Sequence, residues 1–322
     1  MGRLAIRLHL LNAPKEAAVD YLTTLHEVIK KKLIAVEGPL EFGNGESGTR
    51  KLYYLKRLED NLVVPMSGSV RAMYERGGGS ELDGKMCSIR SSSAMTFNLL
   101  GNGPVRISSG KHTGSYELAY EYQLPTLRNS PHPANLDAYL KGEGEDVYCE
   151  MKMFEWLGTP RHTLRPDYLE TTRYLVPCED AESFVAMFQK LACICVMGRG
   201  RKSERLSGGR YDSLQMTKHL LAIYGKLVND ATYRPGKVTL LNCVWEFTNP
   251  SVLEGYMEKY LKMETEEHKG FESFAKLAEE YIAPLFEARG TSLSIEYMTA
   301  AELMEVIEYE PCHRAKLERY IV

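Results

Sequence analysis

The chain has 322 residues, of which 44% are hydrophobic, and a formal net charge of −3. This length allows one sizeable core, and the weak negative charge excludes attraction to nucleic acid through the charge of the whole chain, so such binding requires a local basic patch. No stretch approaches the roughly 18 apolar residues that cross a bilayer, so we expect a cytoplasmic protein that does not enter a membrane. Its seven cysteines lack CxxC spacing and are expected to be reduced structural thiols.

Three segments in the first half of the chain have clear periodicity. Apolar residues at helical spacing predict a helix over 16–36. Serines before an apolar stretch predict a short capped helix within 88–101, with Ala94, Phe97 and Leu100 pointing inward. Alternation predicts a half-buried strand over 116–124. Five of its side chains are expected to share one face: Tyr116, Leu118, Tyr120, Tyr122 and Leu124.

The second half is predicted to mix helices and strands. The expected elements are a buried helix over 182–196, a basic loop over 198–210, a helix over 211–228, a strand over 237–247, and a mostly helical remainder with a late strand over 292–298. The expected fold is therefore α/β, with a mixed central β-sheet flanked by helices and with helical N- and C-terminal additions. We expect three regions of one domain: an N-terminal helical region over 1–85, a core over 86–250 and a mostly helical extension over 251–322.

Residues 135–153, NLDAYLKGEGEDVYCEMKM, form two alternating segments around a Gly- and acid-rich turn. If the pair folds symmetrically about residues 143 and 144, Leu140 lies opposite Val147 and Asp137 lies opposite Glu150. Alternation then places Asp137, Glu150 and Lys152 on one polar face of a hairpin.

Two carboxylates facing each other on neighbouring strands repel unless a positive charge lies between them. A divalent cation, Mg²⁺ or Mn²⁺ in its place, is the natural occupant because it takes one or two carboxylates and keeps waters. Lys152 can orient or deprotonate a water, or stabilise charge on a phosphate. These parts suit hydrolysis of a phosphodiester. The alternative is a solvated hairpin in which Lys152 neutralises Glu150.

The blocks GGGSELDGKMCSIRSSSAMTFNLLG, PANLDAYL and CEMKMFEWLG occur in this order. Together they resemble the PD-(D/E)XK nuclease superfamily, in particular a bacterial branch of restriction-endonuclease-like proteins. The resemblance covers about residues 50–300 and implies a core of helix, three strands, helix and strand. It also implies a Mg²⁺-dependent enzyme of restriction or defence type that acts on DNA.

The same resemblance assigns roles to individual residues. It implies Asp137 and Glu150 as metal ligands, the Met151 carbonyl as an optional further ligand, and Lys152 as the catalytic lysine. Gln215 resembles a glutamine that lies beside the active site in some branches, and an amide on the helix surface is the alternative. Glu155 matches a second acid, whereas Leu136 replaces the proline of the superfamily name.

Several residues near the hairpin are candidates for the site, and each also has a purely structural interpretation. Glu121, or Glu117 on the same strand face, is a candidate third carboxylate, and a solvated strand face is the alternative. His132 is a candidate phosphate contact or an exposed loop residue, and His219 is expected to be a packed histidine that shares a helix face with Gln215. Trp156, Arg161 and His162 are candidates for the DNA side, although Trp156 could equally close the core. Five basic residues of the 198–210 loop are candidate phosphate contacts or plain surface: Arg199, Arg201, Lys202, Arg205 and Arg210.

The sequence therefore predicts a metal-dependent nuclease that hydrolyses DNA. A catalytically silent nucleic-acid-binding or assembly module on the same fold is the alternative, and an enzyme acting on RNA or a nucleotide is a third hypothesis. A homodimer is left open as the assembly state.

Overall fold

A computed structural model describes residues 15–43, 50–77, 80–158, 164–194, 204–205 and 210–322. The helices are α1 (Lys15–Glu37), α2 (Arg50–Tyr53), α3 (Gly68–Arg76), α4 (Ser92–Leu100), α5 (Cys178–Leu191), α6 (Ser213–Asn229), α7 (Met257–Tyr281), α8 (Ala283–Glu287), α9 (Ala300–Val306) and α10 (Pro311–Leu317). The strands are β1 (Val105–Ile107), β2 (Gly114–Leu124), β3 (Ala134–Lys141), β4 (Glu145–Lys152), β5 (Ala192–Ile194), β6 (Glu204–Arg205), β7 (Lys237–Val244) and β8 (Ser292–Thr299). None of the helices described is long and apolar enough to cross a bilayer.

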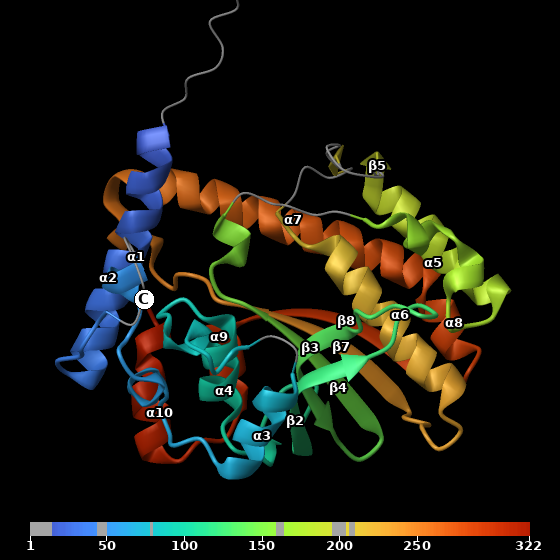
Figure 1. Ribbon diagram of the computed structural model, residues 1–322, viewed down its shortest axis with the longest axis horizontal. Coiled ribbons are helices and arrows are strands. Elements are labelled where there is room, and N and C mark those ends of the chain that lie inside the picture. The colour runs from blue at the N-terminus through green and yellow to red at the C-terminus, as the bar shows by residue number, and fades with distance from the viewer. Residues whose placement is uncertain (1–14, 44–49, 78–79, 159–163, 195–203, 206–209) are drawn as a thin grey trace, which may run out of the picture.

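A six-stranded mixed sheet in the order β1-β2-β3-β4-β7-β8 forms the centre of the molecule. The first four strands are antiparallel, and β7 and β8 continue the sheet in parallel with β4. Helices cover both faces, and Figure 1 shows α1, α4, α9 and α10 gathered on one side and α5, α6 and α8 on the other. The α/β class, the mixed sheet and the flanking helices are confirmed.

Each face of the sheet has its own hydrophobic cluster. The first contains Leu140, Val147 and Cys149 with residues of α1, α4 and α9. The second contains Tyr139 and Tyr148 with residues of α5, α6 and α8. The strands in the middle of the sheet are therefore buried on both sides, as parallel and mixed sheets covered by helices usually are.

Several local predictions are confirmed. The Ser91 side chain accepts a hydrogen bond from the Ala94 N–H at the start of α4, and Ala94, Phe97 and Leu100 are buried. In the hairpin, Leu140 pairs with Val147, the register that symmetric folding predicts. The late strand β8 is present.

Two local predictions are wrong in part. The helix predicted over 182–196 ends at Leu191, and Ala192–Ile194 instead pair with Glu204–Arg205 inside the supposed basic loop. A short apolar run rich in Cys, Ile and Val has no periodicity that separates a helix from a strand.

Strict alternation also fails in β2, where Tyr120 belongs to the first cluster but Tyr122 and Leu124 belong to the second. The change occurs at Glu121, which has a left-handed φ of 48°. On the neighbouring strand Leu136 likewise belongs to a different cluster from Ala138.

Helix α6 is held to the sheet near its C-terminal end by Lys226. The Lys226 ammonium donates to the Tyr122 hydroxyl at 3.1 Å and lies 3.9 Å from the centre of the Tyr233 ring. It also lies over the rings of Tyr139 and Tyr148. A partly desolvated cation on several aromatic faces is favourable by about 2 kcal/mol.

The sheet curls so that its two ends approach each other. Ile107 of β1 forms a bridge with Ile307, which follows α9. His112, between β1 and β2, lies between two carboxylates: its Nδ1 is 2.9 Å from Glu145 Oε1 and its Nε2 is 2.8 Å from Glu296 Oε2. The hydrogen bond to Glu296 raises the pKa of His112, although burial opposes this. The bond from His112 lowers the pKa of Glu296 to about 2.

This network predicts a pH window of stability. A raised His pKa contributes stability that is full below its ordinary value of 6.5 and is lost as the pH rises through the folded pKa. A lowered Glu pKa contributes stability that is full above 4.5 and is lost as the pH falls toward 2. His112→Gln should therefore lower the free energy of unfolding most between about pH 4.5 and 6.5.

Urea unfolding at a series of pH values measures this difference, with exposed His132→Gln as the matched control. A loss in His112→Gln that is the same at every pH would contradict the prediction.

Candidate active site

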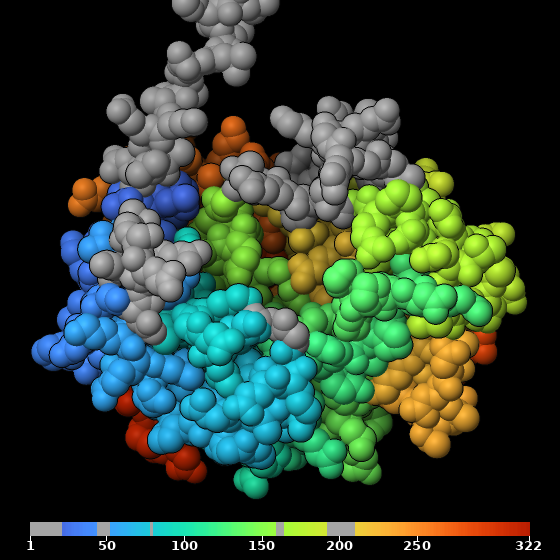
Figure 2. Space-filling view, viewed as in Figure 1, coloured from blue at the N-terminus to red at the C-terminus, as the bar shows by residue number. Residues whose placement is uncertain are grey.

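A polar cavity of about 430 Å³ lies where the hairpin, α6 and the N-terminal part of the chain meet. One wall is formed by Glu121, Asn135, Asp137, Glu150, Glu155 and Gln215, and the other by residues of 54–93 that include Lys85, Arg90 and Ser91–Ser93. In Figure 2 the N-terminal part of the chain, in blue and cyan, lies against the green central segments on the face shown. The cavity thus joins segments that are far apart in the sequence.

Asp137 and Glu150 enter the cavity from the adjacent strands β3 and β4. The Met151 N–H donates to Asp137 Oδ2 at 2.6 Å, which fixes this carboxylate against the backbone of β4. Asn135, one pleat before Asp137, donates to Glu121 Oε2 at 2.5 Å. The sequence places Asp137 and Glu150 on one face, and the structure brings both to one cavity.

Glu121 reaches the cavity because β2 departs from regular strand geometry at this residue. A positive φ such as that of Glu121 is uncommon for a residue other than glycine. Gly77 packs directly behind it, and a Cβ added there would lie 2.6 Å from the Glu121 Cβ. This close approach requires glycine at position 77.

Lys152 is the centre of a hydrogen-bonded network. Its Nζ donates to Glu150 Oε1 at 2.6 Å and to Gln215 Oε1 at 2.8 Å, and the Gln215 amide nitrogen donates to Glu150 Oε1 at 2.7 Å. His219, one turn further along α6, lies with its Nε2 3.0 Å from Glu150 Oε2. His219 is packed and shares the face of Gln215, as predicted, but it also contacts the predicted metal ligand.

The two carboxylates differ in their electrostatics. Burial raises the pKa of Asp137 well above its ordinary value, and the charge of Glu150 adds to the rise. Burial also acts on Glu150, but the charges of Lys152 and His219 outweigh it and lower the pKa of Glu150 to about 2. The pKa of Lys152 is raised by Glu150 despite burial. Glu150 and Lys152 are therefore a charged pair, and Asp137 is the carboxyl that is short of positive charge.

The donor set can be tested against a divalent ion. Asp137 and Glu150 face the cavity, and within the described residues the buried Asn135 Oδ1 has no hydrogen-bond partner. In the described part of the chain no three His, Cys, Asp or Glu side chains lie close enough together to hold a metal ion. Two carboxylates with neutral oxygens fit Mg²⁺ or Mn²⁺, which keep waters in place of further protein ligands.

Asn135, Lys85 and Arg90 line the cavity, and the sequence assigned no role to any of them. Asn135 lies two residues before Asp137, so strand alternation puts both on one face and the signal for Asn135 was present. Its amide nitrogen donates to Glu121, and its Oδ1 is buried without a hydrogen-bond partner among the described residues.

Other predicted residues lie elsewhere or have structural partners. Glu155 Oε2 accepts from the N–H groups of Met153 and Phe154 after β4. Trp156 is buried and donates to the Trp245 carbonyl. Glu117 is exposed and pairs with Lys141, away from the cavity, and His132 is an exposed loop residue.

The predicted phosphate-binding residues are described only in part. The Arg210 guanidinium donates to the Trp156 and Gly158 carbonyls and pairs with Glu266, so its donors hold the protein together instead of facing solvent. Arg199, Arg201 and Lys202, the side chain of Arg205, and Arg161 with His162 lie outside the described residues.

Comparison with models of known protein families, with curated proteins and with solved structures finds no match to this chain.

The two carboxylates should respond to neutralisation in opposite directions. Asp137→Asn removes a charge that burial and Glu150 disfavour, so without metal it should raise the free energy of unfolding by about 1 kcal/mol. Glu150→Gln leaves Lys152 without its anionic partner and should lower it by about 3 kcal/mol.

Urea unfolding in EDTA compares these isosteric variants, each serving as the control for the other. If both variants change the free energy of unfolding in the same direction, the charge distribution described above is wrong.

Proposed function

We propose that this protein is a metal-dependent nuclease that hydrolyses phosphodiester bonds of DNA. The observation that carries the proposal is the juxtaposition of Asp137 with the Glu150–Lys152–Gln215 network at the wall of a polar cavity. The resemblance to the PD-(D/E)XK nucleases assigns roles to the same residues. It also favours a cytoplasmic bacterial enzyme of restriction or defence type.

Each side chain has a role in this proposal. Asp137 and Glu150 would hold Mg²⁺ or Mn²⁺, which supplies electrophilic polarisation of a phosphate. Glu150 raises the pKa of Lys152, which favours the ammonium form, and an ammonium here would stabilise negative charge on the phosphate. Gln215 holds Lys152 and Glu150 in fixed positions through one hydrogen bond to each.

The opposite wall of the cavity suits a polyanionic substrate. Lys85 and Arg90 lie there beside the serines that begin α4, facing the carboxylates across the cavity. Glu81 on the same wall pairs with Lys85 at 3.1 Å and accepts from the Ser93 hydroxyl, so a phosphate would have to compete with it for these two groups. Basic side chains, serine hydroxyls and backbone N–H groups are the usual partners of nucleic-acid phosphates. DNA would then enter between the N-terminal part of the chain and the hairpin.

One observation favours the alternative of a catalytically silent module. Both oxygens of Glu150 already have partners, Lys152 and Gln215 on one and His219 on the other. A closed network of this kind also forms when a former active site serves only to hold the sheet to α6. The cleavage experiment decides between the two.

The proposal predicts Mg²⁺-dependent cleavage of plasmid DNA that EDTA abolishes. Lys152→Ala should lower the rate at saturating DNA by about 10²-fold or more, because it removes a positioned charge needed in the transition state. Lys141→Ala, at the exposed end of the same hairpin, is the matched control and should cleave normally.

Metal binding is measured separately by thermal unfolding. Mg²⁺ or Mn²⁺ at 100 times its dissociation constant should stabilise the wild type by about 2.7 kcal/mol. The effect should be nearly absent in Asp137→Asn and retained in Glu143→Gln, an exposed carboxylate in the hairpin turn. Metal binding without cleavage would favour the silent module. The absence of both metal binding and cleavage would refute the proposed nuclease.

The basic loop should contribute to DNA affinity and not to chemistry. Replacing Arg199, Arg201 and Arg205 together by Ala should weaken binding to all sequences and reduce the log–log salt slope by roughly 0.9 per lost phosphate contact. The maximal cleavage rate should stay unchanged. Binding isotherms at several salt concentrations measure the slope. An unchanged slope would mean that the loop makes no phosphate contacts.

A further inference from the structure

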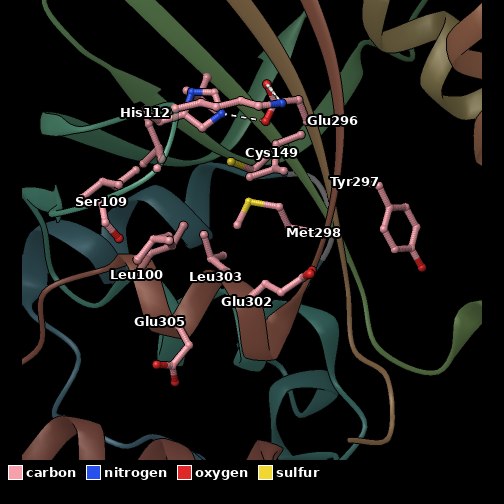
Figure 3. Close-up of a pocket in the computed structure, with 17 residues that line it drawn as sticks. Leu100, Ser109, His112, Cys149, Glu296, Tyr297, Met298, Glu302, Leu303 and Glu305 are labelled. Atoms are coloured by element: carbon pink, nitrogen blue, oxygen red, sulfur yellow. Dashed lines mark hydrogen bonds and ion pairs between the residues drawn. The ribbon is translucent and has the colours of Figure 1, made fainter.

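A second cavity, of about 450 Å³, lies inside the curl of the sheet, between the strands and α9. Its walls come from Leu100 on α4, Ile107 on β1, and Leu140, Val147, Cys149 and Leu241 on the central strands. Leu303 of α9 closes it from below in Figure 3, and Val306 of the same helix also lines it. A volume of several hundred Å³ is in the range of small-molecule sites.

This cavity and the candidate active site lie on opposite faces of β4. The Cys149 side chain lines the second cavity and belongs to the first hydrophobic cluster, whereas its neighbour Glu150 bonds to residues of α6 on the other face. A ligand in the second cavity would not touch the phosphodiesterase site.

The charged groups around the cavity are already paired with protein groups. Glu296 is bound by His112 at 2.8 Å. Glu302 accepts from the Thr299 N–H at 2.7 Å in the capping box of α9, and Glu305 pairs with Arg314 at 2.8 Å. These carboxylates are used by the fold, and each already has a donor.

The remaining polar groups lie at the rim. Lys111 is 78% exposed and lies 3.9 Å from Glu296. Ser109 is exposed, and Figure 3 shows Tyr297 pointing away from the cavity. A charged ligand would give up its hydration without gaining a buried counter-charge among the described residues, and this costs several kcal/mol.

Water is a poor occupant of the interior because an ordered water needs two to four polar partners, and the inner walls are aliphatic or thiol groups. An uncharged, carbon-rich molecule restores the dispersion contacts that an unfilled cavity lacks. We propose that this cavity binds a small uncharged apolar molecule, with its body against Cys149 and Leu303 and its outer end toward Ser109.

The test uses N-phenyl-1-naphthylamine, an uncharged dye whose fluorescence rises in apolar surroundings, with the full-length chain. Binding should be saturable at one site. Leu303→Trp fills the cavity from α9 and should weaken binding about tenfold or more, whereas Leu303→Met keeps the volume and should bind like the wild type.

If Leu303→Trp does not fold, as judged by circular dichroism, Val306→Trp repeats the test, because Val306 is a half-buried lining residue on the same helix. No saturable binding, or unchanged affinity in a folded Trp variant, would overturn the proposal.

The charge preference has its own test. The dye 1-anilinonaphthalene-8-sulfonate has the same ring system with an added sulfonate, so it should bind about tenfold more weakly or worse. Lys111→Ala should leave the affinity of the uncharged dye unchanged. If the sulfonated dye binds as tightly as the uncharged dye and Lys111→Ala abolishes that binding, the ligand of this cavity is anionic and the proposal is wrong. None of these measurements involves DNA cleavage, so their outcome is independent of the proposed nuclease.

Discussion

Strand β4 is covered by helices on both faces, and each of its side chains must find a partner away from water. Val147, Cys149 and Met151 meet this constraint by packing in the first hydrophobic cluster. Glu150 and Lys152 point to the other face, where their side chains are only 4% and 17% exposed. Buried charges are tolerated only when they are paired and hydrogen-bonded. The Glu150–Lys152 pair and its partners on α6 are the consequence.

Helix α6 supplies these partners because it is fixed near both ends. At its start, the Asp212 side chain accepts from the Gln215 N–H at 3.1 Å, which sets the first turn beside β4. Toward its end, Lys226 is held by tyrosines of β2, β3 and β4. Gln215 and His219 are therefore presented to Glu150 by a helix that is anchored on the same sheet.

The two carboxyl groups of the site differ in how well their negative charge is stabilised. Glu150 has a complete set of donors, whereas Asp137 is half-buried beside it, and its raised pKa reflects loss of solvation and the repulsion from Glu150. The left-handed φ of Glu121 adds backbone strain at the same place. Local strain and electrostatic repulsion persist only where the surrounding structure holds them, and functional sites are where they gather.

The sequence by itself determined the features that depend on local periodicity and turns. The hairpin register follows from alternation on both sides of a short turn, the start of α4 follows from Ser91, and the strand after residue 291 follows from its composition. Alternation also placed Asp137, Glu150 and Lys152 together before any fold was known.

Only the tertiary structure decided the features that depend on distant contacts. Glu150 and His219 are 69 residues apart, and no local pattern shows that α6 brings them together. The change of face at Glu121 and the structural use of Arg210 by Trp156, Gly158 and Glu266 likewise arise from packing. Periodicity reports which way a side chain points along one segment, whereas its partner is set by how segments pack against each other.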